Sequence, residues 1–208
     1  NESGIVTASC PDGWISNKNE NRRLGNIMRT AYASDVAVLV VGTNYENEFE
    51  GADRNTLKLN FAQENLILSV ASVNPNVVVV IEAGSAIDMS AWIDKVKGVI
   101  FAGFAGEGTN EVIAEILTGK TNPSGKLSET FPLCLEDTPT GMNFGAPFYN
   151  RYVEGVFVGY RYYDSYQKNV LYPFGYGLSY SKFVYSGLKI DKKTETVHVK
   201  NTGRCREL

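Results

Sequence analysis

The sequence has few of the residue types on which several kinds of active site depend. It contains one histidine, three cysteines and no apolar run long enough to span a bilayer. The single His198 lies in the alternating stretch TVHVKN, where a partly buried structural position is favoured, and its isolation disfavours Ser-His-Asp and Cys-His catalysis. Cys10, Cys134 and Cys205 are far apart and form no CxxC motif, so neither a disulfide framework nor a zinc site is expected.

A strong charge of one sign is also missing. The formal net charge is −3 over 208 residues, which provides no electrostatic footprint for nucleic acid or for an anionic membrane surface. The N-terminus is polar and lacks a signal-peptide pattern, which leaves the compartment open. The hydrophobic fraction of 43% and the charged fraction of 21% are typical of a globular protein, so a packed core is expected.

The first half of the chain has the pattern of an α/β domain. Three short runs are continuously apolar and Val-rich, which favours strands buried on both faces, as in a parallel sheet: Asp35–Gly42, Asn76–Gly84 and Gly98–Gly103. Helical patterns fall around them: Asn21–Ala33, a face made by Leu59, Ala62, Leu66, Val70 and Val73, a short segment after Asp88, and Val112–Leu117 closed by Gly119. The sequence therefore predicts a three-layer α/β sandwich with a mostly parallel sheet.

The second half has a different character. From Asn122 onward Pro, Gly and aromatic residues recur, which indicates a long irregular segment that covers one side of the domain. The stretches KFVYSGLKI and TVHVKN then alternate like strands with one wet face, and two such strands cannot form a stable module alone. We expect a partial α/β domain over residues 1–178 and the beginning of a β domain over residues 179–208.

Carboxylates cluster where the first predicted strand ends. Ligands of open α/β sheets bind beyond the carboxyl ends of the strands, and Thr43–Arg54 begins there. If this loop is extended, Glu46, Glu48 and Glu50 point the same way and raise one another's pKa, as protonation of a glycosidic oxygen requires. On composition alone, a solvated acidic loop remains the favoured interpretation, and a calcium site is a lesser alternative.

Two other features have ordinary interpretations. The stretch AGFAGEGTN, residues 102–110, follows a strand and precedes a helix, but its glycine spacing is not GxGxxG and no P-loop lysine follows. A tight turn is therefore favoured over phosphate binding. The aromatic groups in RYYD and FGYGLSY are expected to pack within the covering segment rather than to stack on sugar rings.

Several ordered motifs resemble one known family. They are ASDVAVLVVGTN, EGADR, NPNVVVVIEAGS, NPSGKL followed by TFP, VEGVFVGYRYYD and YPFGYGLSY. Together they resemble the second domain of glycoside hydrolase family 3, in its β-glucosidase branch, over about residues 23 to 203. The text VHVKNTG resembles the start of the fibronectin type III-like domain that many members carry.

The resemblance implies a retaining mechanism with two carboxylates, usually shared between two domains. In the EGxDR motif the general acid/base immediately precedes the glycine, so that role falls on Glu50. Phe49, Asp53 and Arg54 are candidate substrate-binding residues, although loop anchoring is the favoured role of Asp53 and Arg54. The Asp nucleophile is expected on a TIM-like barrel outside this chain, supplied by the same gene or by another chain, and the first strand of the sandwich domain is also expected to lie outside it.

The implied substrate is a β-linked glucoside or oligosaccharide, with no cofactor, no metal, no nucleic acid and no membrane. The oligomeric state is left open. Other interpretations stay open too: a non-catalytic α/β module for association or carbohydrate binding, a nucleotide-binding protein that uses AGFAGEG, and β-xylosidase or another exo-β-glycosidase specificity.

Overall fold

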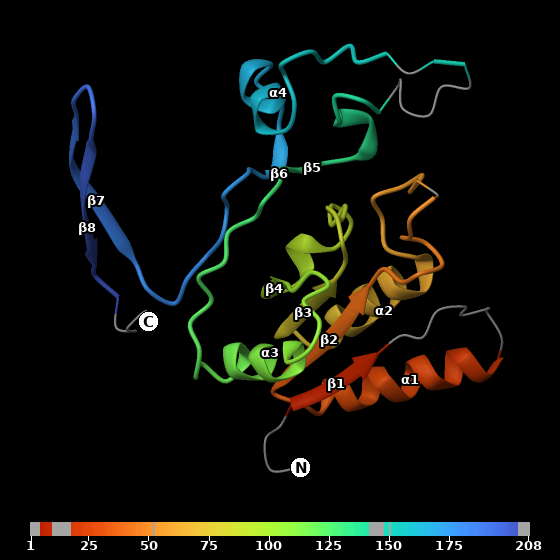
Figure 1. Ribbon diagram of the computed structural model, residues 1–208. Helices are drawn as coiled ribbons and strands as arrows, with labels where there is room; N and C mark the ends of the chain where they lie inside the picture. The colour runs from red at the N-terminus through yellow and green to blue at the C-terminus, as the bar shows by residue number, and fades with distance from the viewer. Residues whose placement is uncertain (1–4, 10–17, 52, 142–147, 150, 204–208) are drawn as a thin grey trace. The chain divides into compact units, whose positions relative to one another are not determined.

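The computed structural model describes residues 5–9, 18–51, 53–141, 148–149 and 151–203 (Figure 1). The chain divides into two compact units. The first comprises Asn1–Ala105 and Glu129–Pro173, and the second comprises Gly106–Ser128 and Phe174–Leu208. The predicted domain boundary at residue 178 falls within the second unit, and the domain assignment itself stays a prediction.

The first unit is built on a four-stranded parallel sheet in the order β1-β2-β3-β4 (Figure 1). The strands are β1 (Ile5–Ser9), β2 (Val36–Gly42), β3 (Val77–Glu82) and β4 (Gly98–Phe101). The prediction of an α/β fold with a parallel sheet is confirmed, and the last three strands lie within the three predicted runs. No strand was predicted before the first helix, where the structure has β1.

The two central strands form the core of this unit. Val77, Val79, Val80 and Ile81 of β3 are completely buried, and Leu39 of β2 is 1% exposed. Because side chains of successive strand residues point to opposite faces, this burial requires cover on both faces of the sheet. The continuous apolar runs were therefore correctly interpreted as strands without a wet face.

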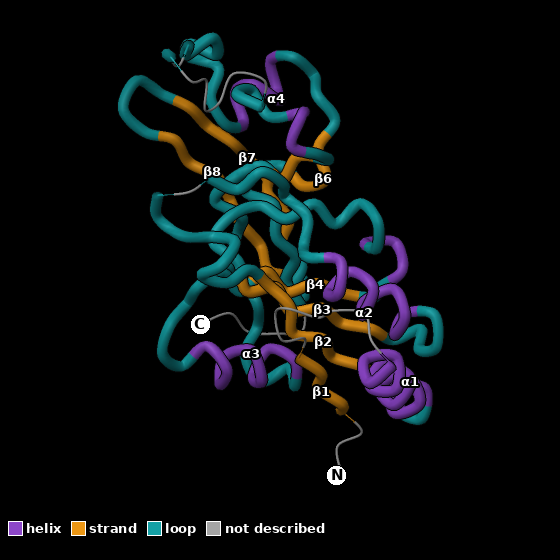
Figure 2. The backbone as a smooth tube through the Cα atoms, turned by 90° about the vertical axis from the view of Figure 1, so that its right-hand side faces the viewer, coloured by secondary structure: helices purple, strands orange, loops and turns teal. Residues whose placement is uncertain are grey.

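Two helices lie on one face of the sheet, α1 (Lys18–Tyr32) and α2 (Phe61–Ala71) (Figure 2). Right-handed crossovers between strands in sequential order place the connecting helices on the same face. The side chain of Asn60 caps α2 by accepting a hydrogen bond from Gln63 N at 2.9 Å. Helix α2 buries Leu66, Ile67 and Val70 and ends before Pro75, as its spacing predicted.

The segment after β3 differs from its prediction. In place of a helix after Asp88, the structure has turns and a single 3₁₀ turn, η1 (Ile93–Lys95). The Asp88 carboxylate accepts hydrogen bonds from the backbone N and the hydroxyl of Ser90, and such local bonds compete with a helix. Trp92 is fully buried and ties the segment to the core.

The remainder of the first unit is largely irregular, as predicted, with short elements that were not predicted. These are β5 (Phe131–Pro132), η2 (Leu135–Asp137), α4 (Tyr160–Ser165) and β6 (Val170–Tyr172), and β5 pairs antiparallel with β6. The rings of Phe101 and Phe131 meet edge to face at 5.1 Å between centroids, which joins this segment to the end of β4.

The second unit contains α3 (Thr109–Leu117) and an antiparallel hairpin of β7 (Phe183–Ile190) and β8 (Glu195–Asn201). The predicted helix and both predicted strands are confirmed. His198 is exposed on β8, which differs from the partly buried position expected for it. No helix in the described part of the chain is long and apolar enough to cross a membrane.

Candidate active site

The ends of three parallel strands meet at the acidic loop. The loop leaves β2 at Thr43, Gly84 and Ser85 follow β3, and Phe104 follows β4. The ring of Phe104 lies 3.1 Å from the position that a Cβ on Gly84 would occupy. The candidate residues thus lie beyond the carboxyl ends of the strands, where ligands bind in open α/β sheets.

The loop itself is a closed turn, so the extended conformation that would align the three glutamates does not form. Asn47 N and Glu48 N both donate to the carbonyl of Asn44, at 3.1 and 2.8 Å. The side chains of Asn44 and Asn47 close the turn by accepting from Glu46 N and Asn44 N, each at 2.9 Å. Asn side chains favour such turns. As a result Glu46 and Glu50 are exposed, while Glu48 is half-buried.

The Glu48 carboxylate faces inward and accepts three hydrogen bonds. Its donors are the Thr43 hydroxyl, Gly84 N at 3.1 Å and the Ser85 hydroxyl at 3.0 Å. Burial raises the pKa of Glu48, but these three hydrogen bonds and the positive charge of Arg54 outweigh it, so the pKa lies below its usual value. The raised pKa that an extended loop would give therefore does not occur at Glu48.

Arg54 holds the far end of the loop. Its Nη1 donates to the Ser85 hydroxyl at 2.8 Å and to the carbonyl of Ala86 at 3.4 Å. Burial lowers the pKa of Arg54, and the charges of Glu48 and Glu129 oppose that shift. These contacts place the guanidinium of Arg54 against the chain that leaves β3.

A third charged group completes this cluster. The group is Glu129, and partial burial of its carboxylate raises its pKa. The nearby negative charge of Glu48 adds to this rise, whereas a hydrogen bond from the Ala86 backbone and the positive charge of Arg54 oppose it. Glu129 therefore has the opposite tendency to Glu48, although both lie near the same arginine.

Glu50 lies at the outer side of the loop. Glu50 is exposed. The next residue, Gly51, has φ +95°, a backbone conformation that residues with a side chain rarely adopt. Asp53 is also exposed, and Phe49 is 49% exposed with its ring centroid 6.4 Å from that of Tyr45. The structure thus separates an inward-facing glutamate, Glu48, from an outward-facing one, Glu50, two positions later.

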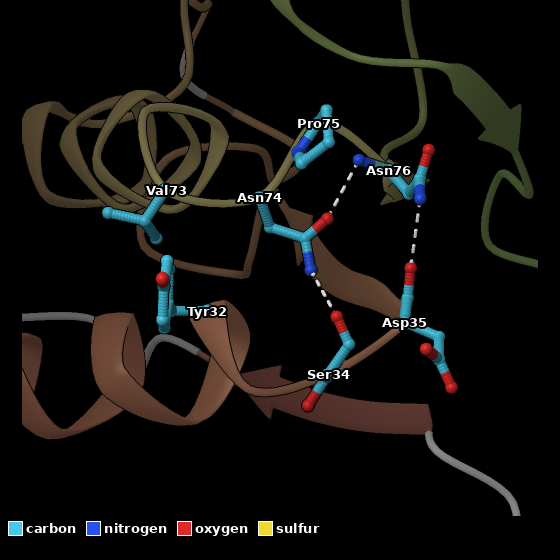
Figure 3. A pocket seen from close by; sticks show the side chains of 7 residues that line it. All are labelled: Tyr32, Ser34, Asp35, Val73, Asn74, Pro75 and Asn76. Carbon is cyan, nitrogen blue, oxygen red and sulfur yellow. Dashed lines mark hydrogen bonds between the residues drawn. The ribbon is translucent and has the colours of Figure 1, made fainter.

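A hollow at the opposite, amino-terminal ends of β2 and β3 has no such cluster of charged side chains. It lies where α1 and α2 lead into β2 and β3, and its lining is Tyr32, Ser34, Asp35, Val73, Asn74, Pro75 and Asn76 (Figure 3). The Asn74 amide donates to the carbonyls of Ala31 and Ser34, at 2.7 and 2.8 Å, and its oxygen accepts from Asn76 N at 2.7 Å. These polar groups join two chain turns, so the hollow has a structural explanation.

The glycine-rich stretch and the cysteines have no special arrangement. Gly103, Gly106 and Gly108 have φ of +64°, +77° and +82°, which fits the interpretation of tight turns. Cys134 is a free, half-buried thiol, and the other two cysteines lie outside the described residues. In the described ranges, no three His, Cys, Asp or Glu side chains are grouped so that they could hold a metal ion.

Comparison with known proteins places the chain among the glycoside hydrolases. A model of the glycosyl hydrolase family 3 C-terminal domain matches residues 6–180. Thermostable beta-glucosidase B of Acetivibrio thermocellus is 45% identical over 185 residues, which are 85% of this chain and 24% of that protein. The exo-alpha-(1->6)-L-arabinopyranosidase of Bifidobacterium breve is 40% identical over 166 residues, 79% of this chain and 22% of that protein.

Solved structures agree with this grouping. The GH3 beta-glucosidase of Bifidobacterium adolescentis has a TM-score of 0.86 and 36% identity over 92% of this chain and 29% of that one. The beta-glucosidase of Kluyveromyces marxianus in complex with glucose has a TM-score of 0.84 and 36% identity over 91% of this chain and 23% of that one. The chain therefore belongs to glycosyl hydrolase family 3, and it spans about a quarter of the length of its curated relatives.

Proposed function

We propose that this chain is the part of a retaining, exo-acting β-glycosidase that supplies the general acid/base, and that Glu50 is that residue. The observation that carries the proposal is the exposed position of Glu50 beside Gly51, beyond the carboxyl end of β2, in a family 3 chain. Glu48 is a poorer acid because three hydrogen bonds hold it in its ionised form.

In this proposal Glu50 protonates the oxygen of the departing group while an Asp carboxylate attacks the anomeric carbon. Glu50, now ionised, then removes a proton from the water that hydrolyses the glycosyl-enzyme, and both carboxylates return to their starting states. The substrate is a β-linked glucoside or oligosaccharide. Phe49 and Asp53 are exposed on the same loop as Glu50 and are the candidates for contact with it, whereas Arg54 anchors the loop.

The proposal requires a second domain. The Asp nucleophile would come from a TIM-like barrel, either in the same polypeptide or in another chain. The β7–β8 hairpin would begin a fibronectin type III-like domain, because two strands need a covered apolar face to be stable. Its residues Tyr185, Leu188, Ile190, Val197 and Val199 are each at least 45% exposed, which supports that need.

A chimera provides the test of this function. In it, the present chain replaces the matching quarter of the thermostable Acetivibrio thermocellus relative. We expect the chimera to hydrolyse an aryl β-glucoside that has a poor leaving group, and to lose most of that activity with Glu50→Gln. The 208-residue chain alone should show no turnover. Efficient hydrolysis by the chain alone, or full activity of the Glu50→Gln chimera, would contradict the proposal.

The relatives named exo-alpha-(1->6)-L-arabinopyranosidases suggest a second candidate specificity, for arabinopyranosides, with the same roles for the two carboxylates. Assaying the chain together with its own barrel domain, rather than the relative's, with aryl glucosides, xylosides and arabinopyranosides separates these possibilities. A preference for the glucoside would support the first proposal.

A further inference from the structure

We infer that Glu48 is a positioning residue: its carboxylate clamps the acid-bearing loop to the ends of β2 and β3 and thereby aims Glu50. The inference rests on the proposed role of Glu50 for its catalytic consequence. The clamp itself stands on contacts within the first unit alone.

The clamp joins parts of the chain that are distant in sequence. Glu48 accepts from Thr43 five positions earlier and from Gly84 and Ser85, which are 36 and 37 positions later. A carboxylate suits this place because all three partners are donors, and hydrogen bonds to an ionised acceptor are stronger than neutral ones.

A second anchor lies on the other side of Glu50. Arg54 Nη1 donates to the same Ser85 hydroxyl that donates to Glu48 Oε1, so one serine holds both anchors. Glu50 lies between them, two residues after Glu48 and four before Arg54. The position of the exposed acid is therefore set from both sides.

Gly84 provides an observation independent of the hydrogen bonds. A Cβ at this position would lie 2.7 Å from Glu48 Oε1 and 3.1 Å from Phe104 Cε2. The Glu48 carboxylate thus occupies space that only a glycine leaves free. Because the obstructing atom is the end of a flexible side chain, Gly84→Ala would move the carboxylate and leave the sheet in place.

Hydrogen exchange of the 208-residue chain measures the clamp directly. In Glu48→Gln one acceptor oxygen becomes an NH₂ group that faces a donor, so we expect exchange at Gly84 N and over residues 43–51 to accelerate by up to about fivefold. Glu46→Gln is the matched control, because it removes the same charge from an exposed side chain in the same loop. Equal exchange in wild type and Glu48→Gln would overturn the inference.

Kinetics of the active chimera measure the consequence for the acid. Thr43→Val removes one donor at nearly constant shape, and Thr43→Ser keeps it. We expect Thr43→Val, Glu48→Gln and Gly84→Ala to lower kcat about tenfold more for aryl glucosides with poor leaving groups than for those with good ones, with KM little changed. Thr43→Ser and Glu46→Gln should resemble the parent.

A general loss of folding would lower the rates for all leaving groups alike, and that result would contradict a positioning role. The two proposals fail separately. Unchanged exchange in Glu48→Gln, together with an acid/base signature for Glu50→Gln, removes the clamp and leaves the function. Accelerated exchange without that signature removes the acid/base role and leaves the clamp.

Discussion

The parallel sheet and the acidic loop that follows β2 are held in place in different ways. The sheet is held by apolar burial spread over many residues, such as Leu39 at 1% and Val79 at 0% exposure. The loop is held by a few polar contacts, mainly those of Glu48 and Arg54. The difference indicates that the sheet governs stability, whereas the loop governs where one exposed carboxylate points.

Truncating one side chain in each region should give the largest contrast. Leu39→Ala leaves a cavity beneath β2 and should reduce the free energy of unfolding by about 2–5 kcal/mol. Phe49→Ala removes a half-exposed ring and should cost less than about 1 kcal/mol. Urea unfolding of both variants measures this, and equal losses would break the comparison.

Two glycines at the ends of neighbouring strands allow a finer comparison between the stability effects in the sheet and in the loop. A Cβ on Gly42 would lie 1.9 Å from the Glu82 carbonyl oxygen, which is backbone and cannot move aside, so Gly42→Ala should cost about 1–3 kcal/mol. The Cβ introduced by Gly84→Ala would lie close only to side-chain atoms, which can move aside, so this substitution should cost less than about 1 kcal/mol. Thermal unfolding distinguishes them, and a larger loss for Gly84→Ala would be contrary to this account.

The pH dependence of stability gives the smallest effect. Because the pKa of Glu48 is lower in the folded chain than its ordinary 4.5, the folded state binds fewer protons, so its contribution is present above that pH and is lost as the pH falls. After solvent screening, Glu48→Gln should cost less than about 1 kcal/mol at neutral pH.

That difference should shrink toward zero in acid. Denaturant unfolding of wild type, Glu48→Gln and the control Glu46→Gln at neutral and acid pH measures it. The raised pKa of Glu129 contributes in the opposite sense in all three proteins. A difference that grows in acid would show that the sign is wrong.

The sheet could be predicted from the sequence, and the loop could not. Continuous Val-rich runs are typical of strands buried on both faces, and burial requires only the local pattern. The loop depends on the Asn44 and Asn47 side chains, which close a turn, and on donors 36 and 37 residues from Glu48. No spacing rule connects those positions, which is why Glu46, Glu48 and Glu50 were expected to face the same way.

The short strands were missed for a related reason. β5 has two residues and β6 has three, too few for a period to be visible, and their pairing joins positions about forty residues apart. Glu50 was selected through the EGADR motif and the family resemblance, since nothing in the local composition distinguishes it from the neighbouring glutamates.

The central claim is that Glu50 is the general acid/base, and leaving-group dependence tests it most directly. In the active chimera, Glu50→Gln should lower kcat/KM by about 10²–10⁴ for glucosides with poor leaving groups and much less for activated aryl glucosides. Added azide should partly restore turnover of the activated substrates. An equal loss on good and poor leaving groups, with no response to azide, would contradict the account.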